Sequence, residues 1–328
     1  MLKGSLVLAI DLGGTKINAA IISSNAEVVA KQYHPTLASE GPQAVTHRLL
    51  SAIEHLLNRS GIGLSRLSSI SIAAAGAIDS DRGLVTVSPN LPGWNDVPLR
   101  DIVRERFGVS TFLLNDASAA ALGEHRLGAG QGAANLIYIT VSTGIGGGVI
   151  ADGKLYLGTG GSAGEIGHMT IAVNGPQCYC GDFGCLEVMA SGVAIAREAI
   201  RRVKDGESST LSDMVAAKIE NITAKEVGLA AQNGDRLASE VVLRAATYLG
   251  VGMVNVVNIF NPEVIVIGGS VVKMGSRLLA PVKKLVAQRA FKLAAQVVRI
   301  VPAQLGDDVG VVGAAIFARE QVLGARRR

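Results

Sequence analysis

All three cysteines of the chain, Cys178, Cys180 and Cys185, lie in one glycine-rich stretch, and His168 stands shortly upstream of them. Three thiolates and one imidazole form a complete tetrahedral shell for Zn²⁺ and leave no position open for water, so the predicted site is structural rather than catalytic. The glycines and the proline of this stretch allow the backbone to fold tightly around an ion. Such a site contributes about 10–16 kcal/mol of binding free energy to local order.

Two other interpretations of these residues stay open at this point. The cysteines could be small buried hydrophobic residues and His168 an ordinary core histidine, but the clustering of every cysteine in one loop favours a metal. A disulfide is less favoured, because the number of cysteines is odd and Cys178 and Cys180 are too close in sequence to pair easily. Carboxylates bracket the loop at Glu165 and Glu187, so it could frame a polar ligand.

A second group of polar residues stands in a glycine turn near the N-terminus. The apolar run Leu6–Ile10 is followed by Asp11, by the turn 12–16, by a second apolar run, Ile17–Ile22, and by a turn at 23–25. This pattern predicts a strand, a tight turn, a second strand, a turn and a third strand. Gly13 and Gly14 would let the backbone approach a phosphate, Thr15 and Lys16 offer donors, and Asp11 could hold a metal ion or its water. The turn alone is weak evidence, since most such turns are plain hairpins and this one lacks the Walker pattern.

The same order of elements occurs again in the second half of the chain. The apolar run Ile137–Val141 precedes a glycine-rich turn at residues 142–148 that contains Thr143 and Gly144, and another strand and turn follow. This internal repeat resembles the symmetry of the actin-like ATPase fold, in which two related domains hold a nucleotide in the cleft between them. Ser142 stands where glycine is more common in that superfamily, which reduces backbone freedom there.

The elements between the two turns lead to further polar residues. Apolar residues recur at helical spacing from Pro42 to Asn58, and Gly61 ends that helix. The strand 70–74 leads to Gly76, and the strand 112–114 ends at Asn115 and Asp116. A carboxylate at a strand end is well placed to act as a general base, an effect worth about 10²–10⁴ in rate. The alternative role of Asp116 is an N-cap of the helix expected over 117–125.

The C-terminal half after the cysteine loop is predicted to be mainly helical. Helical patterning covers 190–203, 211–219, 224–233 and 236–257, and the segments 263–267 and 297–302 are predicted strands. Gly268 and Gly269 directly follow the first of these strands. The segment 310–323 predicts a final helix.

Length and composition set the remaining limits. At 328 residues, with 48% hydrophobic and 4% aromatic residues, the chain suggests about two domains with aliphatic cores. The most apolar stretch, 251–272, is interrupted by asparagines and a proline, so we expect no membrane span. Asp11 comes too early for a secretory signal, which with the free cysteines favours the cytoplasm. The net charge is +4, and the terminal Arg326–Arg328 is expected to be a solvated end rather than a nucleic-acid site.

The stretch from Glu165 to Glu187 resembles the zinc signature of the ROK family, which comprises repressors and sugar kinases, and the likeness extends from Leu6 to about Leu323. Within the family the chain is most similar to bacterial glucokinases. The resemblance implies a two-domain α/β fold of the actin-like (ribonuclease H-like) type with a cleft for nucleotide and sugar and a structural zinc loop. It implies an N-terminal domain over 1–116, on which a C-terminal helix at about 312–328 packs back, and a larger domain over 117–311 with the zinc loop and an oligomerisation surface.

The resemblance also assigns roles to individual residues. Asp116 would take the proton of the sugar 6-hydroxyl as general base, and ATP would bind with Mg²⁺ bridging its phosphates. The residues that would hold the sugar are Gly76, Asn90, Asn115, Asp116, Glu165, His168 and Glu187. The residues that would hold the nucleotide are Asp11, Gly13, Gly14, Thr15, Lys16, Thr143, Gly144, Gly268 and Gly269. The zinc ligands would be His168, Cys178, Cys180 and Cys185, with the second ring nitrogen of His168 facing a sugar hydroxyl.

The resemblance implies ATP-dependent phosphorylation of a hexose in carbohydrate metabolism and glycolysis. Glucose is the leading candidate substrate. The alternatives are an N-acetylmannosamine or N-acetylglucosamine kinase and, in another class, a sugar-responsive repressor. A repressor of this family has a helix-turn-helix before the first phosphate loop, and here that loop begins within about ten residues of Met1. A sugar-binding protein without catalysis is disfavoured by Asp116 and the two glycine loops. A homodimer or homotetramer is expected from the family.

Overall fold

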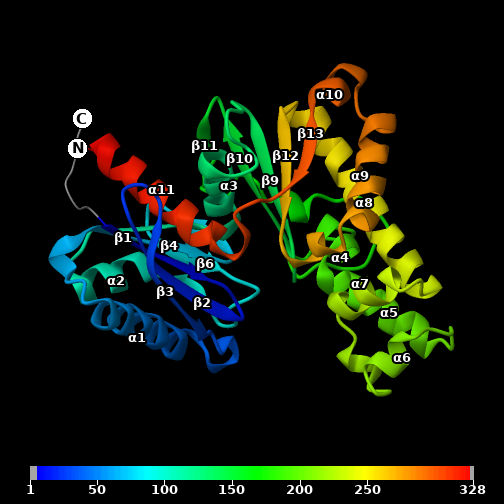
Figure 1. Cartoon of the computed structure of the whole chain (residues 1–328), viewed down its shortest axis with the longest axis horizontal. Helices are drawn as coiled ribbons and strands as arrows, with labels where there is room; N and C mark the ends of the chain where they lie inside the picture. Colours follow the sequence, from blue (N-terminus) through cyan, green and yellow to red (C-terminus); the bar gives the residue numbers. More distant parts are fainter. Residues whose placement is uncertain (1–5, 326–328) are drawn as a thin grey trace. The chain divides into compact units, whose positions relative to one another are not determined.

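The computed structural model describes residues 6–325, so the basic residues Arg326–Arg328 lie outside the described part (Figure 1). The chain divides into two compact units. The first contains residues 1–132, 148–164 and 304–328, and the second contains residues 133–147 and 165–303. This division describes compactness alone, and the domain boundary after Asp116 stays a prediction.

The first unit is organised around a five-stranded sheet with the order β3-β2-β1-β4-β8. β1 pairs with β2 antiparallel and with β4 parallel, and β4 pairs with β8 parallel. The strands are β1 (Leu6–Leu12), β2 (Lys16–Ile22), β3 (Val28–Pro35), β4 (Leu67–Ala74) and β8 (Thr111–Asn115). The strands expected at 6–10, 17–22, 70–74 and 112–114 are therefore confirmed. Because β1, β4 and β8 are parallel, their carboxyl ends meet at one edge of the sheet.

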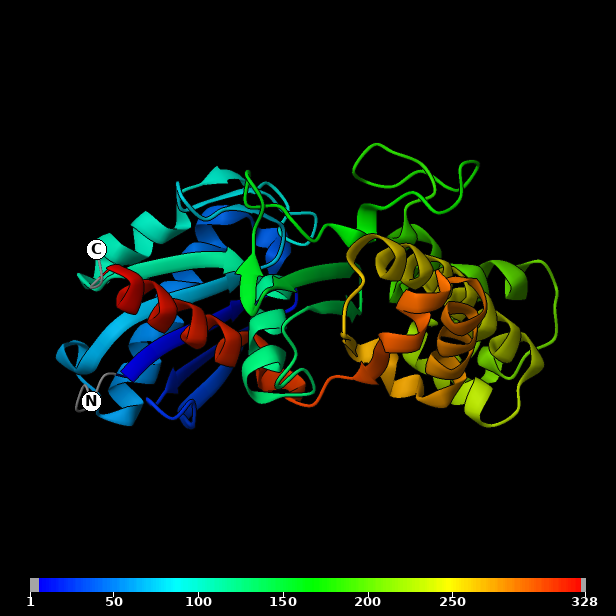
Figure 2. The same cartoon turned by 90° about the horizontal axis from the view of Figure 1, so that it is seen from above.

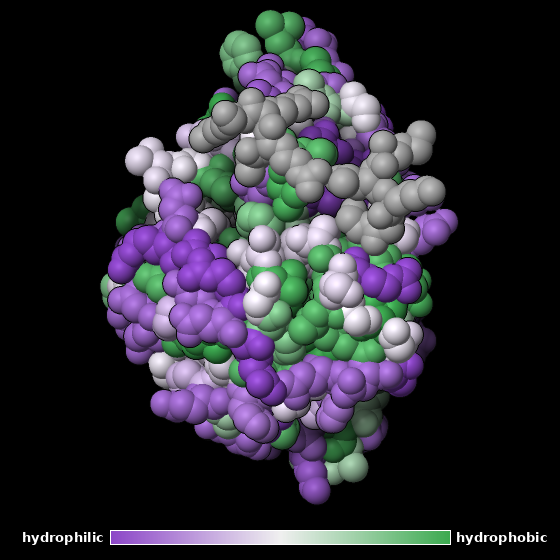
Figure 3. All heavy atoms as spheres, turned by 90° about the vertical axis from the view of Figure 1, so that its left-hand side faces the viewer, coloured by the Kyte–Doolittle hydropathy of each residue, from purple (hydrophilic) through white to green (hydrophobic). Residues whose placement is uncertain are grey.

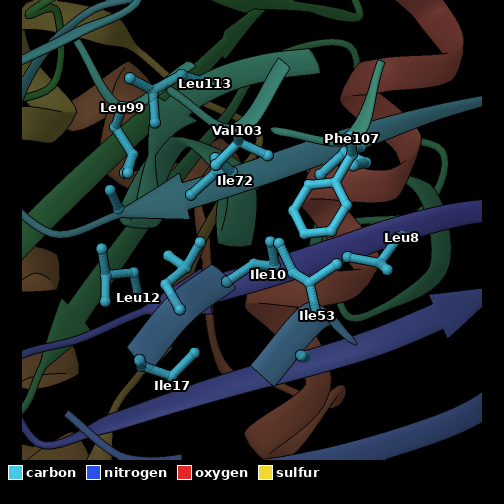
Figure 4. Packing of buried hydrophobic residues seen from close by; sticks show 14 of the residues in the cluster. Leu8, Ile10, Leu12, Ile17, Ile53, Ile72, Leu99, Val103, Phe107 and Leu113 are labelled. Atoms are coloured by element: carbon cyan, nitrogen blue, oxygen red, sulfur yellow. The ribbon is translucent and has the colours of Figure 1, made fainter. Parts of the chain in front are cut away.

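Helices cover both faces of this sheet. α1 (Pro42–Ser60) and α2 (Leu99–Phe107) lie on one side, whereas α11 (Val309–Ala325) lies on the other and packs against β1 and β4 (Figure 1). α1 ends at Gly61, which adopts the left-handed conformation with φ +64°, as the sequence predicts. Aliphatic side chains of α1 and α2, among them Ile53 and Val103, interlock with Ile10 of β1 and Ile72 of β4 in a fully buried cluster (Figure 4).

α3 (Asp116–Leu127) begins directly after β8 and packs closely against α11. The contact uses small residues, since a Cβ at Gly313 of α11 would overlap the carbonyl oxygen of Ala119. A Cβ at Gly123 of α3 would lie 3.0 Å from the carbonyl oxygen of Val309. These two glycines bring the helix backbones together, and the first turn of α3 is thereby held firmly at the end of β8.

A fully buried carboxylate, Glu124, fixes the other end of α3. Its Oε2 accepts a hydrogen bond from the backbone N–H of Ala129 at 2.8 Å. Its Oε1 accepts from the N–H groups of Gln304 and Leu305 at 2.9 and 2.8 Å. A buried carboxylate is costly unless it is hydrogen-bonded, and here three donors satisfy it. Glu124 therefore joins α3 to the segment that leads into α11.

The second sheet has the order β11-β10-β9-β12-β13 and repeats the topology of the first. Its strands are β9 (Leu136–Val141), β10 (Ile145–Ala151), β11 (Lys154–Tyr156), β12 (Val264–Gly268) and β13 (Arg299–Pro302). β12 is parallel to both β9 and β13, as β4 is to β1 and β8. Three strands, a helix, a strand, a helix and a strand thus occur twice, with α8 (Arg236–Phe260) and α9 (Ser276–Arg289) in the places of α1 and α2. This repeat confirms the predicted actin-like α/β fold.

The predicted helices after the cysteine loop are mostly present. They correspond to α5 (Gly192–Lys204), α7 (Ala224–Gln232) and α8, whereas the short α4 (Leu186–Ala190) was not predicted. The helix expected over 211–219 is wrong beyond α6 (Leu211–Met214), because Ala216 and Ala217 adopt positive φ angles of 49° and 60°. The strand expected over 297–302 begins only at Arg299, since α10 (Lys292–Val297) occupies its start. Sequence analysis also missed a small antiparallel sheet of β5 (Ala77–Asp79), β6 (Leu84–Val87) and β7 (Asn95–Val97).

One expectation about α8 needs correction. The sequence was expected to contain no segment long and apolar enough to span a membrane, but among the described residues α8 meets both criteria. The interruptions at 255–263 lie near its C-terminal end, whereas the helix starts at Arg236. Half of its most apolar window is buried inside the structure, a feature that core helices of water-soluble proteins share, so the finding is weak evidence for a membrane span.

The face of the molecule drawn in Figure 3 is mixed in character. Figure 3 shows hydrophilic residues along much of its border and hydrophobic residues exposed between them. Large aliphatic side chains such as Leu8 and Ile70 are fully buried and belong to the core.

Candidate active site and metal centre

The four predicted zinc ligands lie together in the second unit. The Nδ1 of His168 lies 3.6 Å from the Sγ of Cys178, and the Sγ atoms of Cys180 and Cys185 are 3.7 Å apart. All four ligand atoms lie within 4.8 Å of one another. The loop that carries the cysteines extends from the helices of this unit and is drawn in green at the upper right of Figure 2.

These distances fit a tetrahedral zinc ion. With Zn–S about 2.3 Å and Zn–N about 2.05 Å, a regular tetrahedron has S···S edges of about 3.8 Å and N···S edges of about 3.6 Å. The two short edges observed, 3.7 Å and 3.6 Å, agree with these values. Burial raises the pKa of the Cys185 thiol to about 12, so an ion bound here would displace its proton. The donor set and its geometry therefore fit a closed structural zinc site.

Backbone hydrogen bonds hold the cysteine loop in shape. The N–H of Cys178 donates to the carbonyl of Asp182 at 2.7 Å, and that of Gly184 donates to Pro176 at 2.9 Å. The hydroxyl of Thr170 donates to the carboxylate of Asp182 at 3.0 Å. The loop thus closes on itself before Cys185, which directly precedes α4.

The second ring nitrogen of His168 points away from the thiols. Its Nε2 shares a hydrogen bond with the hydroxyl of Tyr179 at 2.8 Å and lies 3.9 Å from a carboxylate oxygen of Glu165. The two rings meet edge to face with centroids 5.1 Å apart. Sequence analysis missed Tyr179, and its place between two cysteine ligands was the only available signal.

Glu187 joins the cysteine loop to the second glycine turn. Its Oε2 accepts a hydrogen bond from the backbone N–H of Ile145 at 2.7 Å. A Cβ at Gly144 would overlap the same oxygen, so a larger residue there would push the carboxylate out of its present position. Glu187 was predicted as a sugar ligand alone, and its contact with this turn is a second role.

The two predicted acids at the margins of the loop share one environment. Burial raises the pKa of Glu165 above its ordinary value, and the negative charge of Glu187 adds to that rise. Burial also raises the pKa of Glu187, against the opposing effect of the Ile145 N–H and of His168. The side chain of Glu165 is 46% exposed and Glu187 is half-buried, and neighbouring carboxylates with raised pKa values are typical of sites that bind polar ligands.

The remaining predicted nucleotide residues of this unit also lie close together. The turn 142–144 contacts the segment after β12, since the hydroxyls of Ser142 and Ser270 are 3.1 Å apart. Gly268 and Gly269 directly precede Ser270 at the carboxyl end of β12. Ser142, which departs from the more common glycine, therefore makes a side-chain contact that a glycine could not provide.

In the first unit, the carboxyl ends of the parallel strands bring the predicted sugar residues together. The side-chain N–H of Asn115 donates to the carbonyl of Gly76 at 3.0 Å. Gly76 has φ +114°, and a Cβ there would overlap the carbonyl oxygen of Val87. The N-cap of α3 is Asn115, whose Oδ1 accepts from the N–H of Ser118 at 3.0 Å, rather than Asp116. Asp116 is half-buried in the first turn of α3.

The first glycine turn packs against the predicted sugar residue Asn90. A Cβ at Gly14 would lie 2.6 Å from the carbonyl oxygen of Asn90. The buried Thr36, which sequence analysis missed, braces the turn: its hydroxyl donates to the carbonyl of Gly13 at 2.6 Å, and its N–H donates to that of Thr15 at 2.9 Å. Hydrogen bonds from Thr36 and packing against Asn90 therefore fix the conformation of this turn.

Asp11, the second-last residue of β1, is half-buried and stands directly before this turn. Burial raises its pKa to about 6, which the positive charge of Lys16 partly opposes and the negative charge of Asp307 reinforces. Lys16 and Asp307 form an exposed ion pair at 3.7 Å. The first turn of α11 lies against the carboxylate, because a Cβ at Gly310 would be 2.6 Å from its Oδ2. The structure thus places a half-buried acid of raised pKa where the sequence predicts a residue that holds a metal ion or its water.

Comparisons with known proteins agree with this arrangement. The ROK family profile matches residues 7–321. A glucokinase of Halalkalibacterium halodurans is 39% identical over 315 residues, which cover 96% of this chain and 95% of that enzyme. A xylose repressor of Caldicellulosiruptor bescii is 33% identical over 307 residues, which cover 94% of this chain and 76% of the repressor.

A solved structure is similar as well. The crystal structure of a ROK family glucokinase from Streptomyces griseus in complex with glucose and AMPPNP superposes with a TM-score of 0.85 at 33% identity, covering 96% of this chain and all of that one. The fold is that of the two-domain α/β sugar-kinase class. The chain belongs to the ROK family, which confirms the resemblance found in the sequence.

Proposed function

We propose that this protein is an ATP-dependent glucokinase that transfers the γ-phosphoryl group to the 6-hydroxyl of glucose. The observation that carries the proposal is the agreement over almost the whole chain with glucokinases, at up to 39% identity, together with an acid at the end of β8 where such a reaction needs a base. Phosphoryl transfer depends mainly on positioning and charge stabilisation, and the protein does little covalent chemistry.

In the first unit, Asp116 is the proposed general base. Asn115, tied to Gly76, and Asn90, packed on the first glycine turn, are proposed to hold the sugar. The N–H groups and side chains of residues 13–16 are suited to a phosphate. Mg²⁺ would screen the phosphates when bound, and Asp11 is the residue proposed to hold it or one of its waters.

In the second unit, Glu165, His168 and Glu187 are proposed to complete the sugar site. The zinc site would fix the imidazole through Nδ1 and leave Nε2 for a hydroxyl. The turn 142–144 and the pair Gly268–Gly269 are proposed to contact the nucleotide, because the Ser142–Ser270 contact brings them together. The family resemblance predicts that these two sets of residues serve one sugar and nucleotide site.

The base is tested by Asp116→Asn. Asparagine keeps the size and the hydrogen-bonding oxygen but removes the basic carboxylate, so kcat should fall by about 10²–10⁴ while glucose affinity stays within a few-fold. A coupled ADP-release assay and calorimetric glucose binding measure the two effects. Turnover within a few-fold of the wild type would remove Asp116 from its proposed role.

The sugar is tested by the same assay across glucose, mannose, N-acetylglucosamine and N-acetylmannosamine. Glucose should give the highest kcat/KM, and an N-acetylated sugar in first place would favour the alternative kinase. The relation to a xylose repressor makes a regulatory role the candidate of a different class. Turnover of any hexose at ordinary kinase rates would exclude a purely regulatory protein.

The remaining proposals concern the pathway, the location in the cell, the oligomeric state and the domain boundary. A glucokinase supplies glucose 6-phosphate for glycolysis and works in the cytoplasm, where thiols stay reduced and available to zinc. A homodimer or homotetramer and a domain boundary after Asp116, with the C-terminal helix returning to the N-terminal domain, are carried forward from the sequence. Light scattering of the purified protein tests the oligomeric state.

A further inference from the structure

The hydroxyl of Tyr179 occupies the hydrogen-bonding position of His168 that the proposed function gives to a sugar hydroxyl. The distance between the phenol oxygen and Nε2 is 2.8 Å, which is ordinary for a good hydrogen bond. A ring nitrogen of histidine has one hydrogen-bonding direction, in the plane of the ring, and serves one good partner at a time. A sugar hydroxyl can therefore bind Nε2 well only after the phenol has left it.

We propose that Tyr179 is an internal competitor of the hexose at His168 and thereby sets the affinity of the site for its sugar. The proposal rests on the proposed contact between His168 and the sugar. The tyrosine acts by holding a binding group and takes no part in phosphoryl transfer, so it belongs to specificity and affinity rather than to catalysis.

The surroundings of Tyr179 allow it to leave. Its side chain is 59% exposed, and its ring meets the imidazole by an edge rather than lying inside a core. Its backbone stands between Cys178 and Cys180, whose thiols belong to the metal cluster. The loop can therefore stay in place while a side-chain rotation moves the phenol into solvent.

The chemistry of the neighbours favours a hydroxyl at this point. A carboxylate oxygen of Glu165 lies 3.9 Å from the same nitrogen. A hydroxyl can pair with the imidazole Nε2 and donate its single hydrogen to one further acceptor, and both a phenol and a sugar hydroxyl meet that description. The ligand expected to replace Tyr179 is therefore a cyclic polyol, such as a hexose, that places one of its hydroxyls at Nε2 of His168.

The test compares Tyr179→Phe with wild type in glucose binding by calorimetry, with zinc content measured for each protein. Phenylalanine keeps the ring and removes the competing hydroxyl, so the Kd for glucose should fall by roughly two- to tenfold, the worth of one hydrogen bond. kcat should stay within twofold. Tyr156→Phe is the matched control, because Tyr156 is also an exposed tyrosine at 53% but lies on β11. Tyr179→Leu should shift the Kd in the same direction.

Two further measurements assign the cause. Among mono-deoxyglucoses, the one that lacks the hydroxyl bound by His168 should gain nothing from Tyr179→Phe. NMR of ¹⁵N-histidine-labelled protein should show that glucose shifts the His168 ring resonances in both proteins. An unchanged or higher Kd in Tyr179→Phe, with His168 still shifted by glucose, overturns the tyrosine proposal alone. Failure of glucose to shift His168 in the wild type overturns the sugar contact and the tyrosine proposal with it.

Discussion

Replacing Glu187 by alanine should weaken nucleotide binding, although the residue was predicted to hold sugar. Its Oε2 accepts from the Ile145 N–H at 2.7 Å, and Ile145 is buried, so no water replaces the lost partner readily. Leaving a buried donor unsatisfied costs about 1–3 kcal/mol. If that cost falls on the loop only when it holds a nucleotide, the Kd for AMPPNP rises by about 5- to 150-fold.

The assay for Glu187 separates its two roles. Calorimetry gives the Kd of AMPPNP and of glucose independently, and coupled ADP release gives the KM of each substrate. Glu187→Gln keeps an acceptor without the charge, so it should retain most of the nucleotide affinity while glucose affinity still falls. Glu220→Ala is the control, since that carboxylate is 71% exposed and pairs with Lys204 at the surface. An AMPPNP Kd within twofold of wild type in Glu187→Ala would refute the link between this carboxylate and the turn.

Three further predictions concern the predicted zinc site, the strained turn at Gly76 and the carboxylate of Asp11. Chelation of zinc, or Cys185→Ser, should lower the Tm and release about one Zn²⁺ per chain, as measured by thermal unfolding and metal analysis; a metal-free protein of equal Tm would contradict it. Gly76→Ala should lower the unfolding free energy by about 1–3 kcal/mol in urea, because φ is +114° and a Cβ would overlap backbone; Gly108→Ala, at φ +65° with open space around it, should cost less. The folded state should hold a proton on Asp11 between about pH 4 and pH 6 that the unfolded state has lost, since the pKa is raised from 3.8 to about 6. Stability should therefore fall as pH rises through this window, by at most about 3 kcal/mol, and urea unfolding of Asp11→Asn should lack that loss; an identical pH profile in both proteins would contradict it.

The parts of the fold that follow from local rules could be predicted from the sequence. The paired strands and glycine turns were visible because alternation and turn residues act over a few positions, and Gly61 ends α1 for the same reason. The helix expected over 211–219 failed because Ala216 and Ala217 turn the backbone to positive φ, which alanine seldom adopts and which local propensity disfavours.

The metal ligands were predictable because their chemistry and clustering are rare together in one sequence. Contacts that depend on how a loop folds in space were not. Tyr179 meets His168 across eleven residues, and Thr36 meets Gly13 across twenty-three, and neither pair has a sequence period that would reveal it. Glu187 was found as an acid at the margin of the loop, but its bond to Ile145 requires the position of α4 relative to β10.

In the duplicated order of strands and helices, the residues proposed to bind the nucleotide and those proposed to bind the sugar stand on different kinds of segment. Residues 13–16, 143–144 and 268–269 stand on turns of the repeated elements, whereas Gly76 and Asn90 lie in the excursion between β4 and α2. His168, Glu165 and Glu187 lie in the much longer excursion between β11 and α8. A change of hexose specificity would therefore require remodelling of these excursions alone, and the repeated elements proposed to hold the phosphate donor would stay unchanged.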